Sequence, residues 1–165
     1  MTWARAMAAI VAFFGAMILV PSPAQAACNP LSFCSCTVTA TGVSFGNYNP
    51  LSSSNINSTG TVRVRCTLVA AFSGSYMIDL STGSSNTYTQ RTVRHGASSL
   101  GYNLYTNSAR SQIWGNGAGG SSNITRSFAA ILAIDRTETV YARIPPSQNV
   151  PGGVYSDTIT VTVTY

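Results

Sequence analysis

Four cysteines are the residues of this sequence whose chemistry is easiest to interpret, because their spacing separates metal binding from disulfide formation. They are Cys28, Cys34, Cys36 and Cys66, in a chain of 165 residues. A zinc site with four cysteine ligands usually groups them as two close pairs. Here three of the four fall within nine residues and no His lies near enough in sequence to substitute. The spacing therefore favours disulfides, and we expect no metal and no cofactor.

The first 26 residues are typical of a secretory signal peptide. Arg5 precedes an uncharged apolar run at residues 6–20, which is followed by Pro-Ser-Pro and by Ala-Gln-Ala at residues 24–26. Small residues at these positions fit cleavage after Ala26. The run of about 15 residues is shorter than the ~20 that a membrane-spanning helix needs. We predict a signal peptide at residues 1–26 and an exported domain at residues 27–165, with no membrane insertion after the signal is removed.

Export would place the cysteines in an oxidising compartment, where two disulfides are expected. Three pairings are formally possible. Cys28 and Cys34 can close a small loop around Pro30, which leaves Cys36 to pair with Cys66 at the end of the next strand-like segment. On the loop-entropy model the second bridge contributes about 3 to 4 kcal/mol and the first about 2 kcal/mol.

His95 is the residue from which a hydrolase would have to be built, since it is the only histidine. Arg91 and Arg94 lie close to it in sequence and no carboxylate does, which suits a surface loop better than a general base. No G-x-S-x-G element accompanies the many serines. The carboxylates that could form a glycosidase pair are Asp79, Asp135, Glu138 and Asp157. Asp157 fits better as a strand-start hydrogen-bonding residue, and we expect no enzymatic activity.

The net charge of +5 comes from nine arginines, because the chain has no lysine. Arg63 and Arg65 share one face of a strand-like segment, but the arginines form no single cluster in the sequence. Nucleic acid is therefore not expected as a partner. Surface solubility accounts for the charge, with acidic polysaccharide or phospholipid headgroups as the alternative.

Alternation of apolar and polar residues with a period of two recurs along the domain, between clusters of Gly, Asn, Ser and Pro. It is clearest at residues 155–165, which read YSDTITVTVTY. Shorter examples lie at residues 36–40, 62–66, 76–80, 100–104 and 140–144, together with an apolar run at 128–134. About seven strands in one domain of this size favour an all-β sandwich.

The last of these strands has the strongest alternation, with Ile159, Val161, Val163 and Tyr165 on one face and threonines on the other. It ends at the final residue of the sequence, so we expect no further segment to pair with its outer edge. Natural monomers usually protect such an edge with Lys or Pro. No charged side chain and no Pro follows Asp157. The sequence thus predicts an edge that accepts a strand from another molecule.

Several motifs of this chain, taken in order, resemble the spore coat protein U domain. They are FGNYNP at 45–50, a strand ending in Cys at 62–66, LGYNLY at 100–105, WGNG at 114–117, TVYARIP at 139–145 and GGVYSDT at 152–158. The resemblance covers residues 36–165. It implies a secreted β-sandwich related to subunits of archaic chaperone-usher pili. Those subunits resemble an immunoglobulin fold that lacks its last strand, which a neighbour or a periplasmic chaperone donates.

By analogy with that family, the donor-strand groove lies between the first and the last strand of the domain. The resemblance assigns to it Val38, Ala40 and Val43 on one side and Ile159, Val161, Val163 and Tyr165 on the other. The implied partners are a periplasmic chaperone, an usher and neighbouring subunits. The implied location is the cell surface or the extracellular space, reached through the periplasm.

Residues 27–35 depart from the pattern of a polymerising subunit, which needs ten or more alternating residues ahead of its first strand. This segment reads ACNPLSFCS, is short and contains Pro30. We therefore expect the chain to accept a strand more readily than to donate one. The alternative function is a spore coat or extracellular matrix protein that acts outside a fibre.

Overall fold

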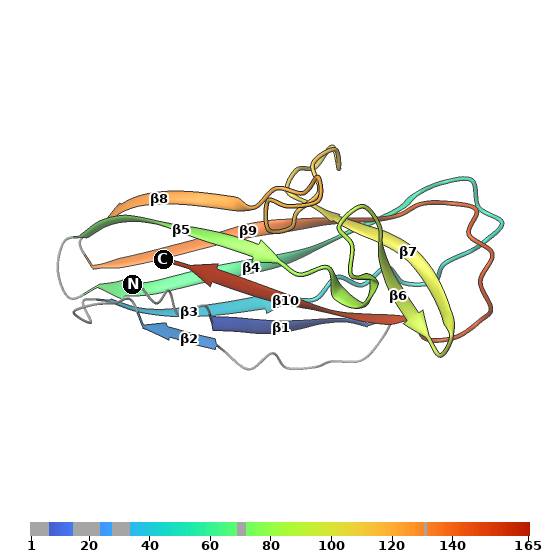
Figure 1. The fold of residues 1–165 in the computed structure, drawn as a ribbon, viewed down its shortest axis with the longest axis horizontal. Coiled ribbons are helices and arrows are strands. Elements are labelled where there is room, and N and C mark those ends of the chain that lie inside the picture. Colours follow the sequence, from blue (N-terminus) through green and yellow to red (C-terminus); the bar gives the residue numbers. More distant parts are fainter. Residues whose placement is uncertain (1–6, 15–23, 28–33, 69–71, 131) are drawn as a thin grey trace.

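The computed structural model describes residues 7–14, 24–27, 34–68, 72–130 and 132–165, which form an all-β structure (Figure 1). The strands are β1 (Met7–Phe14), β2 (Ala24–Ala27), β3 (Cys34–Thr41), β4 (Ile56–Leu68), β5 (Phe72–Leu80), β6 (Arg91–His95), β7 (Ser98–Tyr105), β8 (Ile124–Ala130), β9 (Ala133–Ile144) and β10 (Ser156–Thr164). A short 3-10 helix, η1 (Gly83–Ser85), follows β5. No helix in these ranges is long and apolar enough to cross a membrane.

The strands pair antiparallel and form two sheets. One sheet contains β1, β10, β5 and β8 in that order, and the other contains β2, β3, β4 and β9. β7 links the two, because it pairs with β6 of the first sheet and with β9 of the second. This arrangement confirms the predicted all-β, immunoglobulin-like sandwich.

The core lies between the sheets and is filled by the alternate residues that the sequence pattern indicates. In β4, Val62, Val64 and Cys66 are buried, whereas Arg63 and Arg65 between them are exposed. β3, β5, β7, β9 and β10 contribute similar rows of aliphatic and aromatic side chains. A sandwich whose strands each bury one face produces this alternation.

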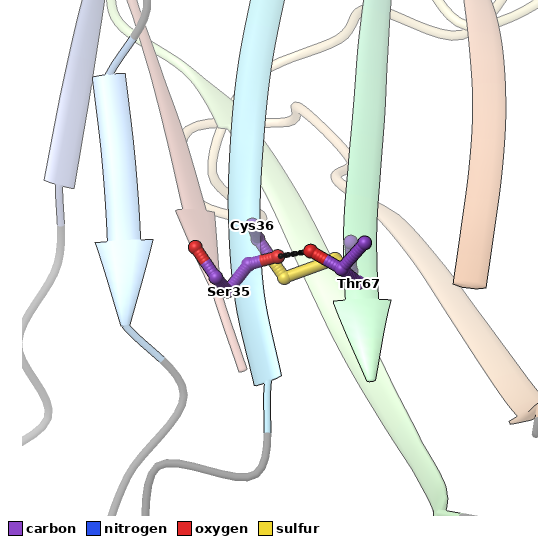
Figure 2. Close-up of a disulfide and its surroundings, with 4 residues drawn as sticks. Ser35, Cys36 and Thr67 are labelled. Atoms are coloured by element: carbon purple, nitrogen blue, oxygen red, sulfur yellow. Dashed lines mark hydrogen bonds between the residues drawn. A yellow bond between two sulfur atoms is a disulfide. The ribbon is translucent and has the colours of Figure 1, made fainter. Parts of the chain in front are cut away.

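A disulfide joins Cys36 of β3 to Cys66 of β4, the pair that the spacing favoured (Figure 2). The two residues are direct partners in the β3–β4 register and are fully buried. Beside the bridge, the Thr67 hydroxyl donates a hydrogen bond to the Ser35 carbonyl over 3.4 Å. Cys28 lies outside the described residues, so its bridge to Cys34 stays a prediction.

After residue 72, the strands differ from the sequence-based expectation in two places. The apolar run at 128–134 is not one strand, because β8 ends at Ala130 and β9 begins at Ala133. β6 was not expected, and His95 is its exposed last residue and not part of a loop. β6 was missed because its inward-facing row begins with Arg91, which is buried although it is charged. A charged residue at an inward position interrupts the alternation of apolar and polar residues that identifies a strand.

Candidate strand-acceptor groove

The side of β10 that faces the core carries the row that the sequence predicted. Ile159, Val161 and Val163 are each at most 2% exposed, and the threonines between them lie on the outer face. Tyr165 ends the row and is 38% exposed. Its ring lies 6.5 Å from that of Tyr76, and burial together with the Tyr76 hydroxyl raises the pKa of Tyr165 to about 12.

One edge of β10 pairs with strands of the sandwich itself. Residues 161–164 pair with β5, and Ser156 pairs with Arg94 of β6. Between these two stretches, Ser81 donates its backbone N–H to the Thr160 carbonyl over 2.9 Å and accepts the Thr160 N–H on its hydroxyl. These bonds hold β10 in place along its inner edge.

The other edge of β10 pairs with β1 over eight residues, from Met7 opposite Val163 to Phe14 opposite Ser156. The expectation that no segment of the chain pairs with this edge is therefore wrong for the chain of 165 residues. The segment that pairs there, β1, lies entirely within the predicted signal peptide. An apolar segment of this length can form a strand, and the sequence-based prediction did not include that possibility. For a domain that begins at residue 27, the open edge stays a prediction.

The opposite wall of the groove is formed by β3 and the residues that follow it. Val38, Ala40 and Val43 are buried and belong to the same core as the β10 row. β2 pairs with residues 35–38 of β3, and β1 lies beside β3 as well as β10 (Figure 1). The structure thus places Val38 and Ala40 on one sheet and Ile159, Val161 and Val163 on the other, and β1 contacts both β3 and β10.

A buried hydrogen-bond cluster fixes the start of β10. The Tyr102 hydroxyl donates to Asp157 Oδ2 over 2.7 Å, and both residues are at most 5% exposed. Asp157 Oδ1 accepts two hydrogen bonds of 2.9 Å, one from the backbone N–H of Ser84 and one from the backbone N–H of Thr158, the next residue of β10. Burial and the adjacent Asp157 charge raise the pKa of Tyr102 well above its ordinary value. Asp157 therefore acts as the strand-start hydrogen-bonding residue that the sequence indicated, and it ties β10 to β7 and η1.

Gly83 makes room for this cluster. Its φ of +65° is in the left-handed region, and a Cβ there would lie 2.1 Å from Asp157 Oδ2. A side chain at this position would push the carboxylate away from β10 or break the turn.

Arg91 forms a second buried polar cluster, which sequence reasoning missed. Its guanidinium donates to the carbonyls of Ser81 and Trp114 and to Asn103 Oδ1, over distances of 2.7 to 3.0 Å. The Arg91 side chain is fully buried and stacks 5.3 Å above the Tyr88 ring. Desolvation lowers the pKa of Arg91, and the nearby tyrosine hydroxyls and Asp157 oppose that shift. The sequence signal that could have indicated the burial of Arg91 is its position two residues before Val93, on the same face of the strand.

The groups that a hydrolase would need are not brought together in the described part of the chain. Asp135 pairs with Arg63, and Glu138 pairs with Arg126. His95 is exposed, with Nδ1 3.1 Å from the Val154 carbonyl oxygen. Among the described residues no group of three or more His, Cys, Asp or Glu side chains is placed to hold a metal ion.

Comparisons with known proteins agree with the sequence motifs. Residues 23–162 match the family model described as the Spore Coat Protein U domain. Protein U of Myxococcus xanthus is 31% identical over 132 residues, which are 74% of this chain and 71% of that protein. One similar solved structure is the chaperone–tip adhesion subunit pre-assembly complex CsuC–CsuE, from archaic chaperone-usher Csu pili of Acinetobacter baumannii. That alignment has a TM-score of 0.49 and 21% identity, and it covers 80% of this chain but 40% of the other.

Proposed function

Because this chain belongs to the Spore Coat Protein U domain family, we propose that its exported domain is a structural or adhesive subunit of a surface assembly. In this proposal the assembly is a pilus of the archaic chaperone-usher type, and a strand from another molecule completes the sandwich. The supporting observation is that β10 pairs along its outer edge only with a segment of the predicted signal peptide, among the described residues. Removal of that segment would leave this edge of β10 without a partner strand among the described residues.

The apolar row of β10 and its open main-chain groups favour replacement of β1 by another strand. Ile159, Val161 and Val163 each contribute roughly 1.5 to 3 kcal/mol when they are fully buried. Of the eight residues of β10 that pair with β1, about half would also lose main-chain hydrogen bonds on this side, because bonded and non-bonded positions alternate in an antiparallel pair. An incoming strand restores both contributions by β-strand addition. A complex formed in this way dissociates slowly, which suits a permanent assembly.

The proposed partners are a periplasmic chaperone, an usher and neighbouring subunits, and the proposed location is the cell surface or the extracellular space. No catalysis is proposed. The acidic side chains that could serve as bases are engaged in ion pairs or in the buried cluster at the start of β10, apart from Asp79. The proposal therefore rests on a binding edge and includes no catalytic site.

A direct test uses the exported protein, with its N-terminus determined by mass spectrometry, and a lysine-flanked peptide with the β1 sequence MAAIVAFF. We expect the peptide to bind and to raise the melting temperature. The Val161→Asp variant should lose binding, because it places a charge in the groove. Thr162→Asp, one residue away on the outer face, is the matched control and should retain binding. An exported domain that is monomeric, melts cooperatively and ignores the peptide would rule out the proposal.

A coat or matrix protein that acts outside a fibre is the second candidate, favoured by the similarity to Protein U and by the description of the matching family. In that case the groove would be closed by the chain's own N-terminus after processing. The same peptide experiment separates the two functions, because a closed groove has no site for the peptide.

A further inference from the structure

A cavity of about 700 Å³ opens at the end of the sandwich where β10 begins. Residues of two motifs noted in the sequence line this cavity. The motifs are FGNYNP at residues 45–50 and GGVYSDT at residues 152–158. Its floor is formed by the buried core residues Val93, Leu100 and Ile144. The cavity therefore connects the surface with the core.

The walls of the cavity are held in place by hydrogen bonds within the chain. Tyr48 accepts the backbone N–H of Gln148 on its hydroxyl over 2.7 Å, and the Tyr155 hydroxyl donates to the Pro151 carbonyl over 2.9 Å. Phe45 packs edge-on against the Tyr102 ring, with ring centroids 6.0 Å apart. Because the tyrosine hydroxyls are engaged, the walls present chiefly aromatic and aliphatic surface. Such a lining suits an apolar occupant.

The cavity continues the groove in which β1 lies. β1 runs antiparallel to β10 and ends with Phe14 opposite Ser156. The next residues on the β10 side are Tyr155 and Val154, and on the other side Val43 lies two residues after the end of β3. All three line the cavity. A strand that occupied the groove in the same direction and extended beyond Ser156 would enter the cavity.

We propose that this cavity receives apolar side chains of the incoming strand, a few residues beyond the one that pairs with Ser156. The inference rests on the proposed function and adds a requirement on the partner, which is an apolar extension at the C-terminal end of its donated strand. The volume lies within the roughly 300 to 1,000 Å³ typical of ligand pockets, so more than one side chain can enter. The rim favours this occupant over a small polar ligand, because Val154 stands 62% exposed there.

The test compares two lysine-flanked peptides on the exported protein. Both begin with MAAIVAFF, and one continues with Leu-Val-Leu and the other with Ser-Gly-Ser. We expect the apolar extension to lower the dissociation constant by at least about tenfold, since each side chain buries apolar surface. Equal constants would overturn the inference and leave the proposed function intact. If neither peptide binds, the proposed function fails and the inference with it.

A filled cavity provides the second arm of the test. A Cβ added at Gly152, which lines the cavity, would have no atom within 4 Å, so the position accepts a side chain and Gly152→Trp is chosen to fill the space. This variant should bind both peptides equally, with the affinity of the Ser-Gly-Ser peptide unchanged. Leu132→Trp, at an exposed position outside the cavity, is the control and should keep the difference. A difference that persists in Gly152→Trp would overturn the inference.

Discussion

The hydrogen bond between Tyr102 and Asp157 gives the sharpest test of how the acceptor strand is held. Replacing Tyr102 by Phe removes the donor to Asp157 Oδ2 and changes little else, because the ring stays in a site that is 1% exposed. The carboxylate keeps its bonds to the backbone of Ser84 and Thr158. Leaving one buried oxygen without this partner costs about 1 to 3 kcal/mol. For a domain of this size that corresponds to a fall of roughly 3 to 10 °C in the melting temperature.

The assay is thermal unfolding of the exported protein with the β1-sequence peptide bound, followed by circular dichroism. Tyr105→Phe is the matched control, because the Tyr105 hydroxyl makes no hydrogen bond within the described part of the chain, and it should melt within about 1 °C of the parent. A Tyr102→Phe protein that melts together with this control would refute the account of the cluster.

The same variant makes a prediction about alkaline pH. The pKa of Tyr102 is raised in the folded state above its unfolded value of about 10. The folded protein therefore holds its proton where the unfolded chain has released it, and the stability from this group is complete below pH 10 and falls as pH rises above 10. Tyr165, with a pKa of about 12, contributes in the same sense between pH 10 and 12. Tyr102→Phe should lose stability less steeply above pH 10 than the parent, and an equal slope in denaturant titrations would contradict this assignment.

Three further perturbations have definite expected outcomes. Replacing Cys36 and Cys66 together by Ala opens a bridge with a sequence separation of 30 and should lower the free energy of unfolding by about 3 to 4 kcal/mol in urea titrations; a loss below about 1 kcal/mol would contradict the loop-entropy account. Arg91→Met leaves buried carbonyls without donors and should cost about 3 kcal/mol or more, and a neutral variant would show that the cluster adds nothing to stability. Arg63→Ala, which breaks an exposed ion pair with Asp135, should leave the melting temperature unchanged at physiological salt, and a clear fall would show that this surface pair is stabilising.

The parts of the fold that follow from local alternation could be predicted from the sequence. β10 and β4 bury every second residue, so a period of two identifies both the strand and its inner face. The spacing of the cysteines favoured the pairing of Cys36 with Cys66 among three formally possible pairings, and the structure shows this bridge. β6 could not be found in this way, because its inward row starts with Arg91, whose charge is satisfied by carbonyls that are distant in sequence.

The groove stays a prediction, because the structure establishes only the burial of six of the seven residues assigned to it. Its two rows, through Val38 on β3 and Val161 on β10, follow from alternation and family resemblance, and the structure places them on facing sheets. The occupant was not predicted, because a hydrophobic leader and an apolar β-strand have the same composition. For a segment of eight residues, the spacing of its apolar residues and its length distinguish a signal peptide from a strand only weakly.

The two edges of the β10-containing sheet differ in the charged side chains that they would present to an added strand. At one end, Arg126 of the edge strand β8 forms a bidentate ion pair with Glu138 of β9, which joins the two sheets across the open side of the sandwich. A charge on an edge strand disfavours pairing with another chain. At the other end, the only charged side chain in β10 is Asp157, and it points into the core and is bonded there. An approaching strand therefore meets no charged side chain of β10 along the eight residues that β1 occupies. In the proposed assembly, this difference favours strand addition at β10 over strand addition at β8.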